Sequence, residues 1–239
     1  MCTILVAWRA VPGAPLIVAA NRDELRSRPS APPGVLDAGP PVIQGGRDLL
    51  AGGTWLAVSA DGRLAAVTNR RVGSRDPDRR SRGELPMLLL ADADPVARLD
   101  RLDPEAYNAA NVIWATADVL AVRHLEHGAD GPLWLGPGAH VLTTVDVDDA
   151  SVDPLRERLA LAVDAHATAG ADAVRTAMEA LLGWHGGDSA PAVCMHGDTY
   201  GSVSSASVTL LEGGGVRYRA ATGQPCTATW DEVAWPAAP

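Results

Sequence analysis

Short apolar segments that alternate with tight turns recur along this chain, and they constrain its fold more than any other feature. One pair flanks Asp61-Gly62, a dipeptide that favours a two-residue hairpin turn, and another flanks three glycines at 213–215. The pairs that we expect to form hairpins are 3–8 with 16–20, 54–59 with 64–68, and 204–211 with 216–221. Strands joined by such short connections are antiparallel neighbours, so the sequence predicts antiparallel sheets.

Helical periodicity occurs in the middle of the chain. The expected helices are 85–91, 95–102, 152–169 and 171–184, with Gly170 between the last two. The expected strands between them are 111–117, 119–125, 133–135 and 140–145. Segment 27–46 is rich in Pro and Gly and predicts an irregular surface loop. Hairpins with interspersed helices, and without alternating βαβ units, indicate an α+β fold in which helices cover antiparallel sheets.

Size and charge narrow the classes of function. The chain has 239 residues, of which 47% are hydrophobic, enough for a single domain over residues 1–239 with its own core. The formal net charge of −9 disfavours nonspecific binding of nucleic acid or anionic lipid. No apolar run approaches the roughly 20 residues that span a bilayer, and the first residues do not resemble a signal peptide. We therefore expect a cytoplasmic protein without membrane insertion.

The cysteine at position 2 could supply both a nucleophile and a general base. If Met1 is removed, Cys2 carries both a thiol and a free α-amine. The α-amine has a pKa of about 7.7 to 8.0, which suits a general base at neutral pH, and the thiol is a good nucleophile. We then expect Cys2 to ionise more readily than an ordinary cysteine. Taken alone, Cys2 is better explained as a small buried residue at the start of a strand.

Several sequence blocks, in a fixed order, resemble one protein family. They are Met1-Cys2-Thr3, Asn21-Arg22-Asp23-Glu24, Gly52-Gly53-Thr54-Trp55-Leu56, Thr68-Asn69-Arg70, Ser81-Arg82-Gly83-Glu84-Leu85, and Tyr200-Gly201-Ser202 with Ser204-Ser205. This set resembles the NRDE family, named for the second block and also called the Transport and Golgi organisation family. That family is in turn similar to N-terminal nucleophile (Ntn) hydrolases of the choloylglycine hydrolase and penicillin acylase type. The resemblance implies a four-layer αββα sandwich and the cleavage or transfer of amide-linked acyl groups.

The resemblance also implies roles for three residues. Cys2 would attack an amide carbonyl with its α-amine as base, Asp23 would hydrogen-bond that amine, and Asn69 would donate to the developing oxyanion. Taken singly, Asp23 is better explained as a strand-end cap or ion-pair partner and Asn69 as a turn residue; their combination with Cys2 favours catalysis. The resulting hypothesis is an Ntn-type cysteine amidase or acyltransferase that acts on a small-molecule amide or acyl substrate, with neither cofactor nor metal.

A second group of residues is expected to contact the substrate. They are Asn21, Arg22, Trp55, Arg82, Thr144 and Val203. Arg82 ends the arginine-rich segment 70–82, which is either a solvated loop or a recognition site for a carboxylate or phosphate. At positions 144 and 203 the family generally carries Asn and Arg, so Thr144 and Val203 imply an altered pocket in a specialised enzyme.

Two alternatives remain open at this point. NRDE proteins are associated with haem handling, so the same sandwich could bind a flat, haem-like small molecule without catalysis. Catalysis needs a free Cys2 amine, whereas a carrier does not. Separately, Cys194, His196 and Asp198 alternate as on one strand face and could form a soft metal site. No fourth ligand lies nearby in sequence, which favours an ordinary strand followed by a loop.

Overall fold

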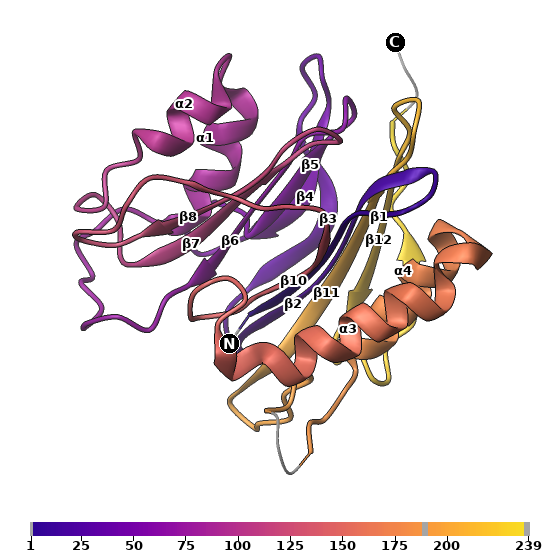
Figure 1. Ribbon diagram of the computed structural model, residues 1–239. Helices are drawn as coiled ribbons and strands as arrows, with labels where there is room; N and C mark the ends of the chain where they lie inside the picture. The colour runs from indigo at the N-terminus through magenta and orange to yellow at the C-terminus, as the bar shows by residue number, and fades with distance from the viewer. Residues whose placement is uncertain (1, 188–190, 237–239) are drawn as a thin grey trace.

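The computed structural model describes residues 2–187 and 191–236, and this part of the chain forms two antiparallel sheets. The six-stranded sheet has the order β10 (Gly138–Leu142), β1 (Thr3–Val11), β2 (Ala14–Leu25), β11 (Tyr200–Leu210), β12 (Val216–Thr222) and β13 (Asp231–Glu232). The seven-stranded sheet runs from β3 (Ser30–Asp37) through β4 (Ile43–Asp48), β5 (Leu56–Ser59), β6 (Leu64–Asn69), β7 (Ala110–Ala115) and β8 (Leu120–Leu125) to β9 (Leu133–Trp134). The two sheets face each other (Figure 1).

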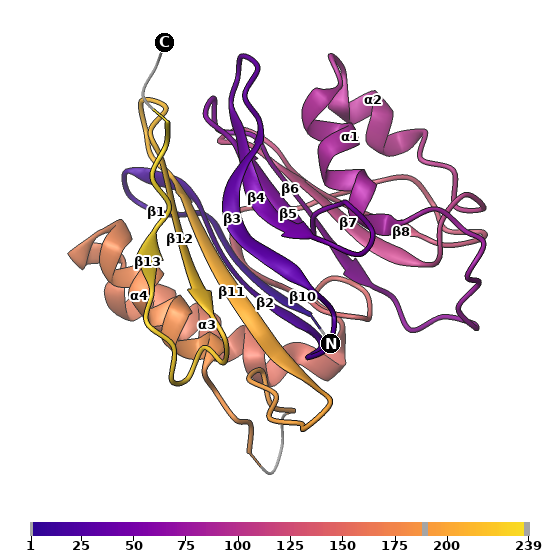
Figure 2. The same cartoon turned by 180° about the vertical axis from the view of Figure 1, so that it is seen from behind.

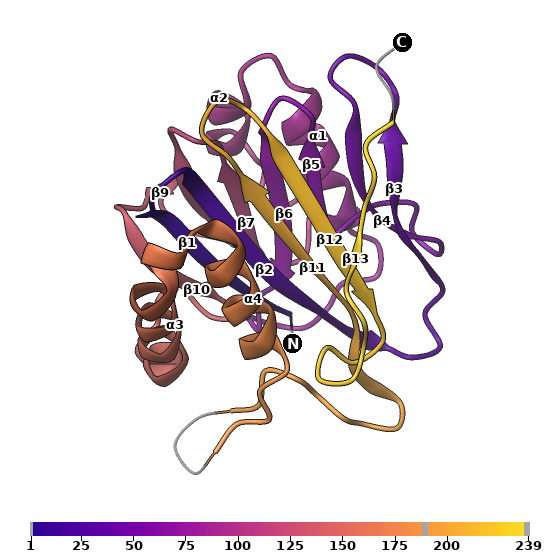
Figure 3. The same cartoon turned by 90° about the vertical axis from the view of Figure 1, so that its right-hand side faces the viewer.

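Helices cover the outer face of each sheet. On the seven-stranded sheet lie α1 (Leu85–Ala91) and α2 (Pro95–Asp100), and on the six-stranded sheet lie α3 (Asp153–His166) and α4 (Ala171–Leu182). Figure 3 looks through α3 and α4 onto the six-stranded sheet, with α1 and α2 on the far side. Short 3-10 helices occur at Arg82–Glu84, Ala150–Val152 and Ala167–Ala169. Among the described residues, no helix is both long and apolar enough to cross a bilayer.

Three apolar cores lie between these four layers. The alternation of side chains along each strand assigns neighbouring residues to different cores. Successive side chains of a strand point to opposite faces of its sheet. Val6 of β1 therefore packs between the two sheets, against residues such as Leu56 and Ile113, whereas its neighbour Leu5 packs under Leu159 of α3. A third core lies beneath α1 and α2. The αββα sandwich of the α+β class that we expected is confirmed.

The hairpins follow the turn residues as predicted. β1 and β2 pair with Thr3 opposite Asn21, and β11 pairs with β12 across the glycine loop. In the β5–β6 turn, Gly62 has φ of +84°, a conformation that glycine adopts without steric cost. α3 and α4 are likewise separated at Gly170, whose φ is +97°. These elements are determined by local patterns that the sequence makes visible.

The loop predicted over 27–46 is wrong, because this segment forms β3 and β4. β3 is an edge strand, and its pairing with β4 shifts register between Ala31 and Gly34, where Pro32 and Pro33 lie. Proline has no backbone N–H, so a sheet tolerates it at an edge or a bulge. The prolines therefore made the segment look like a loop in the sequence, although they do not prevent the strand from forming. Figure 2 shows β3 at the front of the molecule.

Candidate active site

One end of the sandwich contains a small cavity in which several strand ends meet. Its volume is about 350 Å³. The predicted site residues that line it are Cys2, Arg22, Asp23, Trp55, Asn69 and Arg82. Cys2 directly precedes β1 and Trp55 directly precedes β5, while the others come from the end of β2, the end of β6 and the 3-10 helix at Arg82–Glu84. Segments far apart in sequence thus bring the three catalytic candidates to one cavity.

Asp23 is held by the strand next to it. The β2–β11 register places Ser202 opposite Asp23, and the Ser202 hydroxyl donates to Asp23 Oδ1 at 2.6 Å. The Tyr200 hydroxyl donates to the Asp23 carbonyl at 2.9 Å. Burial raises the pKa of the Asp23 carboxyl above its ordinary value, while the bond from Ser202 acts in the opposite direction. The carboxylate is therefore fixed in position inside a partly desolvated site.

Cys2 lies directly beside Asp23. Its half-buried thiol is 3.9 Å from the Asp23 carbonyl oxygen, to which it donates. Burial raises the pKa of this thiol, the negative charge of Asp23 raises it further, and the positive charge of Arg22 counteracts them. In the chain that begins at Met1 this thiol is therefore not readily ionised, and the expectation for a Cys2 with a free α-amine stays a prediction. The physical reason is that a thiolate would form out of water next to a carboxylate.

Arg22 forms one wall of the cavity together with Trp55. The guanidinium carbon lies 4.6 Å from the centre of the Trp55 ring, a cation–π contact. The Arg22 side chain is 5% exposed and approaches Glu24 and Asp48 at 3.8 and 3.6 Å. Its Nη1 is buried and has no hydrogen-bond partner among the described residues. The site therefore contains a guanidinium N–H with spare donor capacity.

Asn69 and Arg82 approach the cavity from the other sheet. Asn69 is the exposed last residue of β6 and lies opposite Ala110. Arg82 is half-buried and donates to the Ala109 carbonyl at 3.1 Å. Burial and the nearby charge of Arg75 lower the pKa of Arg82. In the lining of the cavity six arginines stand against four carboxylates, and this excess of positive charge favours an anion there.

Asn21 does not line the cavity. Its side-chain amide donates to the carbonyl oxygens of Leu182 and Val193, at 2.9 and 3.1 Å, and accepts from the Ser205 hydroxyl at 2.6 Å. Asn21 is one residue from Arg22, so strand alternation directs it toward α4 while Arg22 faces the second sheet. In this structure Asn21 joins the six-stranded sheet to its helix layer.

Thr144 and Val203 are also absent from the lining of this cavity. Thr144 is buried, and its carbonyl accepts from the Arg71 amide at 3.1 Å. Val203 lies at an irregularity in β11, between the Ser202–Asp23 and Ser204–Arg22 pairs. The prediction that both face the same cavity as Cys2 does not match this geometry.

Sequence reasoning missed the residues that support Asp23. Ser202 and Tyr200 stood in a recognisable block, but their pairing with Asp23 depends on the register of strands about 180 residues apart. Arg75 and Arg79, from the arginine-rich segment, also line the cavity. Residues 71–78 of that segment are exposed, so both hypotheses for it, a solvated loop and a recognition site, stay open.

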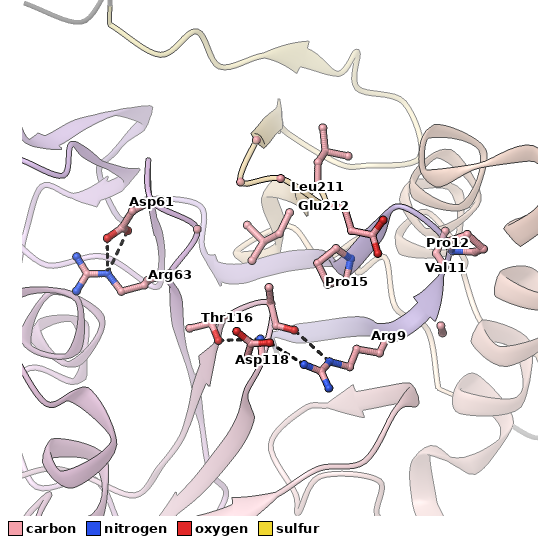
Figure 4. A pocket seen from close by; sticks show the side chains of 17 residues that line it. Arg9, Val11, Pro12, Pro15, Asp61, Arg63, Thr116, Asp118, Leu211 and Glu212 are labelled. Atoms are coloured by element: carbon pink, nitrogen blue, oxygen red, sulfur yellow. Dashed lines mark hydrogen bonds and ion pairs between the residues drawn. The ribbon is translucent and has the colours of Figure 1, made fainter.

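A larger hollow of about 760 Å³ lies at the opposite end of β1, among hairpin turns (Figure 4). Four of its five charged side chains pair with one another: Arg9 binds Asp118 at 2.8 Å, and Arg63 binds Asp61 at 3.0 Å, while the fifth is Glu212. Its lining includes neither a cysteine nor a histidine. Chemistry rather than size therefore favours the cavity at Cys2 as the functional site.

Solved structures with a similar fold include Ntn hydrolases. A Caenorhabditis elegans N-acylethanolamine-hydrolyzing acid amidase ortholog matches with a TM-score of 0.58 at 13% identity, over 86% of this chain and 92% of that one. A mutant of the conjugated bile acid hydrolase from Clostridium perfringens matches with a TM-score of 0.57 at 10% identity, over 99% of this chain and 97% of that one. At such low identity the likeness concerns the fold alone.

Sequence comparison then defines the family. The model for Transport and Golgi organisation 2 matches residues 1–209, and the chain belongs to that family. The Transport and Golgi organization 2 homolog of Mus musculus is 36% identical over 137 residues, and its Homo sapiens counterpart is 36% identical over 141. Each match covers 54% of this chain and 50% of the relative, so the chain spans about half the length of the curated relatives it matches.

Proposed function

We propose that this chain is an Ntn-type cysteine amidase or acyltransferase whose nucleophile is Cys2 after removal of Met1. The observation that carries the proposal is the shared cavity: the Cys2 thiol lies beside Asp23, and Asn69 lines the same space. The Ser202 and Tyr200 hydroxyls hold Asp23 in place. The Ntn-hydrolase fold supports the same class of chemistry.

The proposed reaction proceeds in two stages. The Cys2 thiol passes its proton to the Cys2 α-amine as Sγ bonds to the amide carbonyl carbon, and Asn69 stabilises the oxyanion. The C–N bond then breaks, and the α-amine returns the proton to the leaving nitrogen. Water or another acceptor finally attacks the thioester carbon and gives its proton to the α-amine; the C–S bond breaks, the amine returns the proton to the thiolate, and the acyl group leaves on the acceptor. Because the structure raises the pKa of the thiol, proton transfer to a base is a necessary part of this scheme.

The charges around the cavity support an acidic substrate. Arg22 has an unpaired buried N–H, Arg82 has its charge disfavoured by burial, and Arg75 lies nearby. A carboxylate or phosphate on the substrate would satisfy these donors, since guanidinium binds both groups well. The volume of about 350 Å³ suits a small molecule. We therefore infer a small acyl amide that carries an anionic group.

The test combines intact mass, turnover and trapping. N-acyl amino acids and matched N-acylethanolamines would be offered to natively expressed protein whose mass shows loss of Met1. We expect preferential turnover of the acidic amides and an acyl adduct on Cys2. Cys2→Ala should abolish both, and Cys2→Ser should retain partial turnover because a hydroxyl can use the same base. Full retention of Met1, or full activity in Cys2→Ala, would exclude Cys2 as the nucleophile.

Asn69→Ala separates the oxyanion role from substrate binding. We expect kcat to fall by about 10² to 10³, the typical effect of removing one oxyanion donor, with KM changed much less. The side chain is exposed, so the fold should persist. An unchanged kcat would remove Asn69 from the mechanism. If the wild-type protein binds haem or another flat ligand tightly but turns over none of the amides, the noncatalytic carrier replaces the enzyme as the better hypothesis.

A further inference from the structure

Four metal-ligating side chains converge outside the cavity at Cys2. They are His185, which follows α4, Cys194 and His196, which precede β11, and Cys226, which lies between β12 and β13. Their ligand atoms all lie within 4.8 Å of one another. The sequence pointed to Cys194, His196 and Asp198 and offered no fourth ligand. Folding supplies His185 and Cys226 instead, while Asp198 is not part of the cluster.

Ordinary hydrogen bonding explains this cluster poorly. The Nε2 atom of His196 has three neighbours: His185 Nε2 at 3.1 Å, Cys194 Sγ at 3.4 Å and Cys226 Sγ at 3.2 Å. A single ring nitrogen offers either one N–H or one lone pair, so it can satisfy only one of them. The side chains are arranged around a common point rather than in pairs.

A disulfide does not explain the cluster either. The sulfur atoms of Cys194 and Cys226 are 3.5 Å apart, well beyond the bond length of about 2.05 Å. A disulfide would also leave the two imidazoles without a reason to face the sulfurs. The rings of His185 and His196 meet edge to face, with an interplanar angle of 73°. Their Nε2 atoms are 3.1 Å apart, so both nitrogens occupy the same small region.

We propose that His185, Cys194, His196 and Cys226 form a tetrahedral zinc site. Bonds of about 2.3 Å to sulfur and 2.0 to 2.1 Å to nitrogen place tetrahedral ligand atoms about 3.3 to 3.8 Å apart. Four of the six separations between the ligand atoms are 3.1 to 3.5 Å, close to that range, and the other two are within 4.8 Å. Two sulfurs and two imidazole nitrogens select zinc over the hard cations Mg²⁺ and Ca²⁺. Binding releases the two thiol protons to solvent.

The site is structural, because four protein ligands fill the coordination sphere. It joins three segments that are distant in sequence. The Cys194 amide donates to the Trp184 carbonyl at 2.9 Å, and Cys226 packs against Gly183. Between the two middle ligands, the Met195 amide donates to the Ser202 hydroxyl at 3.0 Å. The zinc site would therefore fix the start of β11, from which Ser202 reaches Asp23. The assignment does not depend on the proposed function.

The experiment measures metal binding by the full chain. Protein purified with a thiol reductant would be stripped with a chelator, titrated with Zn²⁺ against a competing chelator, and loaded with Co²⁺ as a spectroscopic probe. We expect one zinc per chain and the absorption of tetrahedral, thiolate-bound cobalt. Zinc should also raise the melting temperature, because it binds the folded state.

Matched variants decide the ligand set. His185→Gln and Cys226→Ser should each weaken zinc binding at least about 10-fold. The controls are His127→Gln, an exposed histidine bonded to Glu105, and Cys2→Ser, the cysteine outside the cluster; both should keep full affinity. His185 is exposed, so its variant should fold even if a cysteine variant does not. Three outcomes would overturn the assignment. They are binding of well below one equivalent of zinc, an unchanged zinc affinity in His185→Gln, and a Cys194–Cys226 disulfide that persists under reductant.

Discussion

At the scale of single residues, two serines of β11 donate similar hydrogen bonds, one to a residue of the cavity and one to a residue outside it. Ser202 donates to Asp23 at 2.6 Å, and Ser205 donates to Asn21 at 2.6 Å. Both hydroxyls are buried and both partners belong to β2. Only the Ser202 bond reaches a residue that lines the cavity. The pair therefore separates an effect on the site from an effect on the sheet.

Ser202→Ala should shift the pH profile of turnover, with Ser205→Ala as its matched control. The bond from Ser202 lowers the pKa of Asp23, so its loss should raise that pKa further above the ordinary value. The acidic limb of kcat/KM then moves to higher pH. Each variant should lose on the order of 1 kcal/mol of stability, because each leaves a buried acceptor with one bond fewer. Equal pH profiles in the two variants would contradict a role for Ser202.

The thiol of Cys2 offers a second residue-scale test that needs no substrate. Burial and the charge of Asp23 both raise its pKa in the chain that begins at Met1, so in protein that retains Met1 Cys2 should react with iodoacetamide at neutral pH more slowly than free cysteine does. Asp23→Asn removes the charge and keeps an acceptor for Ser202, so labelling should become faster. Peptide mapping at several pH values measures this. Slower labelling in Asp23→Asn would show that the carboxylate does not disfavour the thiolate.

At the scale of elements, a contact between two glycines positions one wall of the cavity. The Thr54 amide donates to the Gly83 carbonyl at 2.8 Å, which holds the start of β5 against the 3-10 helix that carries Arg82. A Cβ on Gly53 would lie 2.4 Å from the Gly83 carbonyl carbon and oxygen. No side chain fits between these backbones, so the close approach requires glycine.

Gly53→Ala should therefore destabilise the protein by about 1 to 3 kcal/mol, the usual effect of overpacking. It should also displace Trp55 and Arg82 from each other and raise KM for the acidic substrate. Gly136→Ala is the control, because a Cβ there meets no heavy atom within 4 Å. Chemical denaturation of both variants gives the comparison. If Gly53→Ala kept the wild-type free energy of unfolding, the close contact between residues 53 and 83 would not contribute to stability.

At the scale of the whole molecule, a half-buried ion pair makes the free energy of unfolding depend on pH. His140 of β10 contacts Asp148 at 2.7 Å and the Gly136 carbonyl at 2.8 Å. Burial opposes charge on His140, but these bonds raise its pKa overall. Burial likewise opposes charge on Asp148, while the bonds from His140 and the Val141 amide lower the pKa of that carboxyl.

The signs of these shifts define a pH window. A raised histidine pKa adds stability that is complete below its unfolded value of about 6.5 and disappears as pH rises through the folded value. A lowered aspartate pKa adds stability that is complete above about 3.9 and disappears as pH falls through the folded value. The pair should thus stabilise most between about pH 4 and 6.5. His140→Gln should lose on the order of 1 kcal/mol at pH 6 and much less at pH 8. Melting curves at pH 6 and pH 8 measure this loss of stability. An equal loss at the two pH values would show that the ion pair does not cause the pH dependence.

Local patterns in the sequence determined the hairpins, the helices and the αββα class. Asp61-Gly62 allows a tight turn, and alternation along β1 sends Leu5 and Val6 into different cores. Both effects act within a few residues, through backbone dihedral preferences and the period of the side chains. The proximity of Cys2 to Asp23 follows in the same way, because one short hairpin pairs Thr3 with Asn21.

Only the tertiary structure decided which polar side chains meet across elements. It directed Asn21 to the helix layer, placed Ser202 beside Asp23, and brought Cys226 to within 3.5 Å of Cys194 although 32 residues separate them. It also formed β3 despite its prolines. Such encounters depend on strand register and on how sheets and helices stack, which are set by the burial of all the apolar faces together. No short window of sequence contains that information.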